Sequence, residues 1–162
     1  YAYIMNDDGT ISVSAYTGSD TDLTVPGLID GYVVTGIADH AFEANADIKS
    51  ITLPNGLITI GESAFSDCSS LTTVVIPDTV GTIRRGAFIS CTALTTLDIP
   101  ASVTEIMEEA FTGCAALKDL TVESSTVEFT NWWVDTDEIT CPKDSKIAAW
   151  AEKNNVATEP LS

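Results

Sequence analysis

The sequence is organised by an internal repeat with a period of 23 residues. The dipeptide Ala-Phe recurs four times at this spacing, at Ala41-Phe42, Ala64-Phe65, Ala87-Phe88 and Ala110-Phe111. Two further residue types keep the same period, at Pro54, Pro77 and Pro100 and at Cys68, Cys91 and Cys114. Because many independent positions agree on one period, the repeat decides which folds are available to the chain.

Each unit is predicted to contain two short strands and a turn. The segment from Leu71 to Ile76 is rich in β-branched residues, and Pro77 ends the strand because proline has no N–H to donate to a ladder. A second strand is predicted over 80–84, and 86–90 suits a helical or 3₁₀ turn. One unit cannot bury its own apolar stripe. We therefore predict a solenoid in which equivalent Leu and Phe side chains stack in columns.

The two ends of the chain depart from the repeat and are predicted to be caps. The segment from Tyr1 to Tyr16 alternates around Asp8-Gly9, which is typical of a β-hairpin. Near the other end, apolar residues with helical spacing follow Ser145, a good N-cap residue. We predict one domain over 1–162, with an N-terminal hairpin cap at 1–19, repeats at 20–123 and a C-terminal cap at 124–162.

Composition and charge exclude several classes of partner. The chain is 44% hydrophobic and 19% charged, which favours a folded protein over a disordered one. Its 7 basic and 24 acidic residues give a net charge of −17, which repels phosphate backbones and anionic lipids. No apolar run approaches the ~20 residues of a membrane-spanning helix. We expect neither nucleic-acid binding nor direct membrane insertion.

The recurring Leu-Pro, Ile-Gly, Ala-Phe and Cys motifs resemble the BspA-like, Treponema pallidum type of leucine-rich repeat. The resemblance covers roughly Leu23 to Val122. It implies a right-handed leucine-rich-repeat solenoid of the β-rich α/β horseshoe type, with about five coils of 23 residues, short parallel strands and 3₁₀ or helical turns. Three local departures affect the turns: the expected Gly is kept only at Gly61, Asn45 replaces the first Cys, and five residues are inserted around Asp30-Gly31.

The same resemblance implies a function, because BspA-like proteins are typically exported bacterial surface proteins associated with attachment to host or neighbouring-cell proteins. It implies a non-enzymatic protein-binding or adhesion module, secreted or on the cell surface, with an extracellular protein as partner. A signal peptide is expected to have been trimmed before Tyr1. The alternative is a structural spacer within a larger surface protein. The oligomeric state stays open.

Two surfaces are candidate binding sites. The first is the outward side of the predicted Leu-x-Leu strands, which has no aromatic ring, so we expect modest affinity from it. Its candidate residues are Lys49, Ser50, Thr52, Thr73, Val75, Thr96, Asp98, Lys118, Asp119 and Thr121. The second is Trp132 and Trp133, which are expected to cap the last coil together with Trp150. If one of the pair stays exposed, it is the strongest single anchor for a ligand.

The cysteines are predicted to be structural. Cys68, Cys91 and Cys114 occupy one repeat position, so their side chains should be parallel, which is poor geometry for a disulfide. We predict that they form a ladder of free, buried thiols. The state of Cys141, outside this ladder, is left open.

The sequence offers no catalytic, cofactor or metal-binding motif. The sole histidine, His40, occupies the repeat position that elsewhere holds Ser63, Gly86 and Glu109, which indicates a solvated site without catalytic partners. The acidic clusters are interpreted as turns and solvated faces, because none continues into a calcium-binding loop of the EF-hand type. Dependence on calcium remains open.

Overall fold

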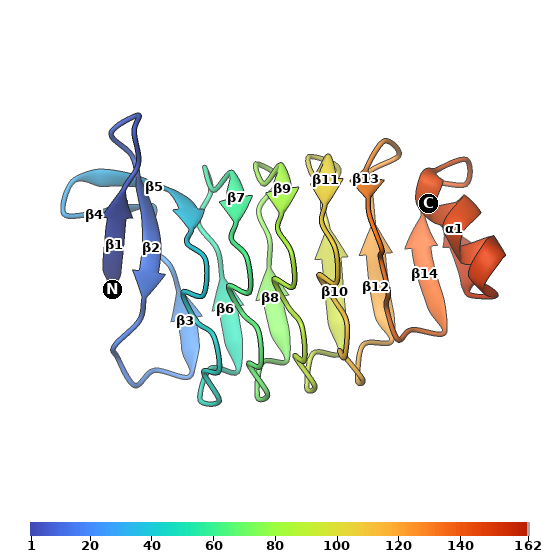
Figure 1. Ribbon diagram of the computed structural model, residues 1–162, viewed down its shortest axis with the longest axis horizontal. Helices are drawn as coiled ribbons and strands as arrows, with labels where there is room; N and C mark the ends of the chain where they lie inside the picture. Colours follow the sequence, from blue (N-terminus) through green and yellow to red (C-terminus); the bar gives the residue numbers. More distant parts are fainter. Residues whose placement is uncertain (162) are drawn as a thin grey trace.

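The computed structural model describes residues 1–161 and is a β-solenoid of about seven turns. Successive turns lie side by side along the long axis, with β1 at one end and the C-terminal helix at the other (Figure 1). The predicted leucine-rich-repeat solenoid is confirmed, but the predicted number of about five coils is too low. The additional turns come from strands after Val122, where the 23-residue spacing is no longer regular.

One side of the solenoid carries the Leu-x-Leu strands, and we call its outward surface the threonine-rich face. Its strands pair in parallel, and Leu97 and Leu120, which are 23 residues apart, are in register, as the repeat requires. Strands β8 and β10 lie in successive turns of the solenoid but belong to separate hydrogen-bonded sheets. The strands are β3 (Asp22–Thr24), β6 (Ser50–Thr52), β8 (Thr73–Val75), β10 (Thr96–Ile99), β12 (Asp119–Val122), β14 (Glu138–Cys141) and β15 (Ala157–Pro160).

The opposite side is one eight-stranded sheet built largely from two-residue strands. Its central strands are parallel, and Ile60, Ile83 and Ile106 are in register. The strands are β1 (Ala2–Met5), β2 (Ile11–Ala15), β4 (Leu28–Ile29), β5 (Tyr32–Ile37), β7 (Thr59–Ile60), β9 (Thr82–Ile83), β11 (Glu105–Ile106) and β13 (Glu128–Phe129).

The N-terminal end is closed by the predicted hairpin. Strands β1 and β2 are antiparallel, and β2 pairs in parallel with β5, so the side chains of Ile11 and Val13 are fully buried. The five-residue insertion forms a second hairpin between β4 and β5. Its turn residues Asp30 and Gly31 both have positive φ, 52° and 86°, as a tight two-residue hairpin turn requires.

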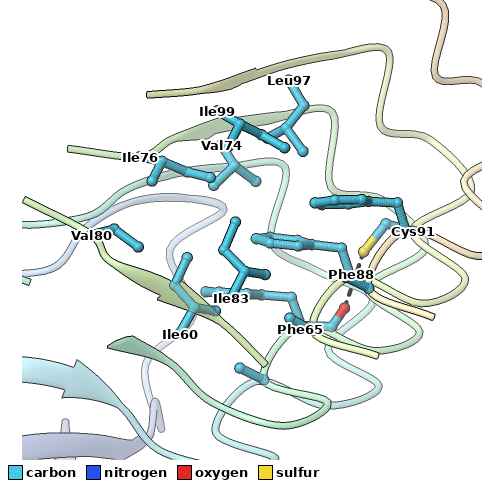
Figure 2. Packing of buried hydrophobic residues seen from close by; sticks show 14 of the residues in the cluster. Ile60, Phe65, Val74, Ile76, Val80, Ile83, Phe88, Cys91, Leu97 and Ile99 are labelled. Atoms are coloured by element: carbon cyan, nitrogen blue, oxygen red, sulfur yellow. Dashed lines mark hydrogen bonds between the residues drawn. The ribbon is translucent and has the colours of Figure 1, made fainter. Parts of the chain in front are cut away.

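The core is a set of stacked columns, the most regular of which consists of phenylalanines. The rings of Phe42, Phe65, Phe88 and Phe111 stack with successive centroid distances of 5.1, 5.2 and 5.8 Å and interplanar angles of at most 15°. Figure 2 shows Phe65 and Phe88 beside Ile60 and Ile83. The predicted columns are therefore present, and each ring supplies apolar surface to the next turn.

The cysteine ladder is confirmed. All four cysteines are free and buried. The Sγ of Cys68 donates to the carbonyl of Phe42 in the preceding turn at 3.1 Å, and Cys91 and Cys114 do the same to Phe65 and Phe88 at 3.0 and 3.1 Å. The dashed line in Figure 2 marks the Cys91 bond. In the first unit Asn45 replaces the cysteine, and its Oδ1 instead accepts from the backbone N–H groups of Asp47 and Ile48.

The C-terminal end combines a short helix with aromatic packing. Helix α1 (Lys146–Asn154) is capped by Ser145, whose side chain accepts from the Ala148 N–H at 3.1 Å, as predicted. Trp132 is 4% exposed, and its ring lies 4.9 Å from that of Trp150 and 6.4 Å from that of Phe111. The phenylalanine column thus ends on an indole.

Candidate functional site

The structure exposes nearly all of the predicted strand-face residues. Lys49, Thr52, Thr73, Val75, Thr96, Asp98, Lys118 and Asp119 are exposed, while Ser50 and Thr121 are half-buried. Between them lie the inward residues Ile51, Val74, Leu97 and Leu120, which are all buried. Alternation within each short strand therefore separates core side chains from surface side chains, as the period of two in a β-strand dictates.

Hydroxyl groups of this face fix neighbouring side chains and backbone. Ser50 donates to Asp22 Oδ1 at 2.6 Å, and Thr72 donates to the carbonyl of Lys49 at 2.9 Å. Hydrogen bonds from Ser50 and Thr21 hold the pKa of Asp22 below its ordinary value. These contacts join one turn to the next, so the charged groups of the face are held on a rigid scaffold.

The two adjacent tryptophans have different environments. Trp132 is buried in the cap, and its Nε1 has no hydrogen-bond partner within residues 1–161. Trp133 is 57% exposed, and its Nε1 donates to Asp135 Oδ1 at 3.1 Å. Of the two candidate anchors, only Trp133 is exposed; Trp132 is wrong as an exposed anchor, because its ring packs against Trp150 and Phe111 in the cap.

Trp133 lies at a groove of about 500 Å³ at the C-terminal end of the threonine-rich face. Residues from three elements line it: Lys118 from the segment that leads into β12, Asp135 and Asp137 from the segment before β14, and Trp150 and Asn154 from α1. The groove therefore combines two indoles with two carboxylates, two side-chain amides (Asn154 and Asn155) and an ammonium group. Sequence analysis identified Trp133 and Lys118 as binding candidates and assigned Trp150 to the cap. It did not place Asp135, Asp137 or Asn154 in a binding site, because these three belong to no repeat position.

A second groove, of about 490 Å³, lies on the eight-stranded sheet, between the turn of the N-terminal hairpin and strands β5 and β7. Its polar groups are largely engaged with one another. Asn6 Nδ2 donates to Thr10 Oγ1 at 2.9 Å, the hydroxyls of Thr10 and Thr35 are 2.7 Å apart, and Ser12 donates to Asn6 Oδ1 at 3.0 Å. These bonds tie the hairpin to the first turns, so we interpret them as structural.

The remaining chemically reactive residues do not assemble into a site. His40 Nδ1 lies 3.0 Å from Glu43 Oε2 at the surface. Burial raises the pKa of the Cys68 thiol to about 12, so this sulfur is held in its unreactive form. Residues 1–161 contain no group of three or more His, Cys, Asp or Glu side chains that could hold a metal ion. Nor does this part of the chain include a helix with the length and hydrophobicity to cross a bilayer.

The position of His40 has a role that sequence analysis missed. His40, Ser63, Gly86 and Glu109 all adopt the left-handed conformation, with φ between 50° and 60°. Ala44, Asp67, Ser90 and Gly113 form a second such column. The residue types vary because the backbone conformation, not the side chain, is what the turn needs. The glycines at 86 and 113 were the only sequence signal for this left-handed conformation, because glycine adopts positive φ without steric cost.

Solved structures share this fold over most of the chain. A leucine-rich repeat protein from Treponema pallidum is 25% identical with a TM-score of 0.81, over 86% of this chain and 68% of that one. One from Bacteroides capillosus is 34% identical with a TM-score of 0.60, over 64% and 80%. A leucine-rich cell surface protein from Faecalibacterium prausnitzii is 30% identical with a TM-score of 0.62, over 85% of this chain and only 42% of that one.

Among curated proteins, the search found no match. The family comparison is decisive, because the profile described as BspA type leucine-rich repeat region matches six copies over residues 33–140. That match covers well over half of the chain and coincides with the stacked turns between β5 and β14. Relatives of this fold include a cell-surface protein. The chain therefore belongs to the BspA-type leucine-rich repeat family.

Proposed function

We propose that the chain is a non-enzymatic binding module of a secreted or cell-surface bacterial protein, and that its threonine-rich face engages an extracellular protein. The observation that carries this proposal is the contrast between the two sides of each Leu-x-Leu strand. Inward positions keep aliphatic side chains from turn to turn, whereas outward positions change among Lys, Ser, Thr, Val and Asp on an unchanged backbone. A rigid frame with varied, exposed side chains is the usual basis of recognition by solenoids.

The chemistry of this face sets the kind of partner it would take. Acidic side chains at Asp22, Asp98 and Asp119 alternate with Lys49 and Lys118 over a flat surface without aromatic rings. Such a face has no hot spot of the Trp, Tyr or Arg type, so affinity would come from many polar contacts. The net charge of −17 favours approach of a partner with a basic surface and makes the association rate sensitive to salt.

The proposal is tested by binding to immobilised extracellular-matrix proteins with the whole chain. For a matrix protein that is captured, the double variant Lys49→Ala/Asp98→Ala should weaken binding by about tenfold or more, since two charged contacts on the face are lost. The matched control is Glu105→Ala, which removes an exposed charge from the opposite sheet. Thermal unfolding of both variants should stay close to that of the parent.

Equal weakening by Glu105→Ala and by the double variant would contradict a role for the threonine-rich face. Failure of every matrix protein to bind at micromolar concentration would favour the alternative, a structural spacer. One observation supports that alternative: the chain spans 42% of the related Faecalibacterium prausnitzii protein, so modules of this kind can be parts of longer surface chains.

A further inference from the structure

We propose that the groove at Trp133 binds a neutral saccharide, which stacks one sugar ring on the exposed indole. The site lies at the C-terminal end of the molecule, and the ligand class differs from the protein partner proposed above. An exposed indole beside a groove is the arrangement in which an apolar ring face finds a platform and its polar edge finds partners. On the threonine-rich face itself no aromatic side chain is available for stacking.

The segment that carries Trp133 is fixed by contacts on three sides. Val134 forms a parallel bridge with Phe111, in the preceding turn. The Thr136 hydroxyl donates to the carbonyls of Lys118 and Glu138 at 3.2 and 2.9 Å, and the Asp137 carbonyl accepts from the Ala157 N–H at 3.0 Å. The indole orientation is set by its hydrogen bond to Asp135. The platform is therefore formed before any ligand arrives, which limits the entropy lost on binding.

The polar lining selects the ligand class. Asp135 and Asp137 supply carboxylate acceptors, Lys118 supplies donors, and the amide of Asn154 provides both. Within residues 1–161, Lys118, Asp135 and Asp137 take part in no salt bridge. One carboxylate oxygen of Asp135 accepts from the Trp133 indole, which leaves its other oxygen to accept from a ligand. An anionic ligand would face two carboxylates in a chain with a net charge of −17, and a cationic one could use the two carboxylates but not the donors of Lys118. A neutral ring with several hydroxyl groups can use donors and acceptors of both kinds.

The test is titration of the whole chain with neutral hexasaccharides of glucose, mannose, galactose and N-acetylglucosamine. Binding is followed by tryptophan fluorescence and by calorimetry.

At least one of the four hexasaccharides should bind at millimolar concentration or below and change the fluorescence of the exposed indole. Trp133→Ala should weaken that binding by about tenfold or more, and Trp133→Tyr should retain part of it, because stacking depends on an aromatic face. Tyr32→Ala is the matched control, since Tyr32 is an exposed aromatic residue at the opposite end of the solenoid.

Three outcomes would overturn the proposal. None of the four hexasaccharides binds, or binding persists in Trp133→Ala, or hexa-arginine binds at Trp133 while the saccharides do not. The last result would assign the groove to basic peptides. The variants used here leave Lys49 and Asp98 intact, so failure of this site is distinguishable from failure of the threonine-rich face.

Discussion

At the residue scale, the cysteines show how one repeat position serves both packing and hydrogen bonding. Each ladder thiol fills a small apolar space and donates to a phenylalanine carbonyl of the preceding turn. The burial of these residues was predictable from their common position in the repeat. Their acceptor was not, because the sequence does not show that the turn of one unit places a carbonyl opposite the sulfur of the next.

Burial of Cys68 leads to a prediction about reactivity and alkaline stability. With a pKa of about 12, the thiol stays protonated at pH 8, so a disulfide reagent should not modify it in the native protein but should do so in denaturant. The folded state holds this proton more tightly than the unfolded state. The resulting stability is complete below pH ~9, the ordinary range of a thiol, and is lost as pH rises through about 12. Thiol titration and urea unfolding at several pH values measure both effects, and rapid native labelling of Cys68 would contradict the buried geometry.

At the element scale, the turns were predicted in position but not in conformation. The sequence indicated a turn after each second strand, and the structure adds two left-handed residues to it. Most of these positions hold residues other than glycine, so composition alone does not reveal the conformation. The C-terminal turns were missed for a related reason. Leu120 pairs with Ile139, a separation of 19 residues instead of 23. A pattern with a fixed period of 23 residues therefore does not detect this shortened unit.

The left-handed turns predict a stabilising substitution. Ser63 has φ of 50°, its hydroxyl has no hydrogen-bond partner within residues 1–161, and Gly86 occupies the same position one turn later. Ser63→Gly should raise the free energy of unfolding by about 0.5–1 kcal/mol, since relief of left-handed strain exceeds the added entropy of the unfolded chain.

Ser14→Gly is the control for that substitution. Ser14 lies in β2 with extended backbone, so glycine should lower stability there by a similar amount. Urea unfolding measures both variants. Destabilisation by Ser63→Gly equal to that by Ser14→Gly would show that the turn conformation is not strained.

At the scale of the whole molecule, equivalent side chains stacked along one axis also stack like charges. Glu105 and Glu128 are opposite each other in the ladder between β11 and β13, an arrangement that is unfavourable for two carboxylates. The described part of the chain contains four salt bridges, all with exposed partners, against a net charge of −17. Exposed pairs of this kind contribute little, so repulsion should dominate the electrostatics of folding.

Salt should therefore stabilise this protein. Raising sodium chloride from ~0.02 to ~0.5 M shortens the Debye length from about 20 Å to about 4 Å and screens repulsion between turns. We expect Tm to rise by about 3 °C, because a gain near 1 kcal/mol in the free energy of unfolding shifts the Tm of a domain of this size by that amount.

Sucrose at equal osmolality is the control, because it is excluded from the protein surface as salt can be but does not screen charges. Glu105→Gln removes one of the opposed charges and should reduce the salt-dependent rise. A Tm that falls with salt would mean that the few exposed salt bridges outweigh the repulsion, and that the stacked acids are spaced widely enough for solvent to separate them.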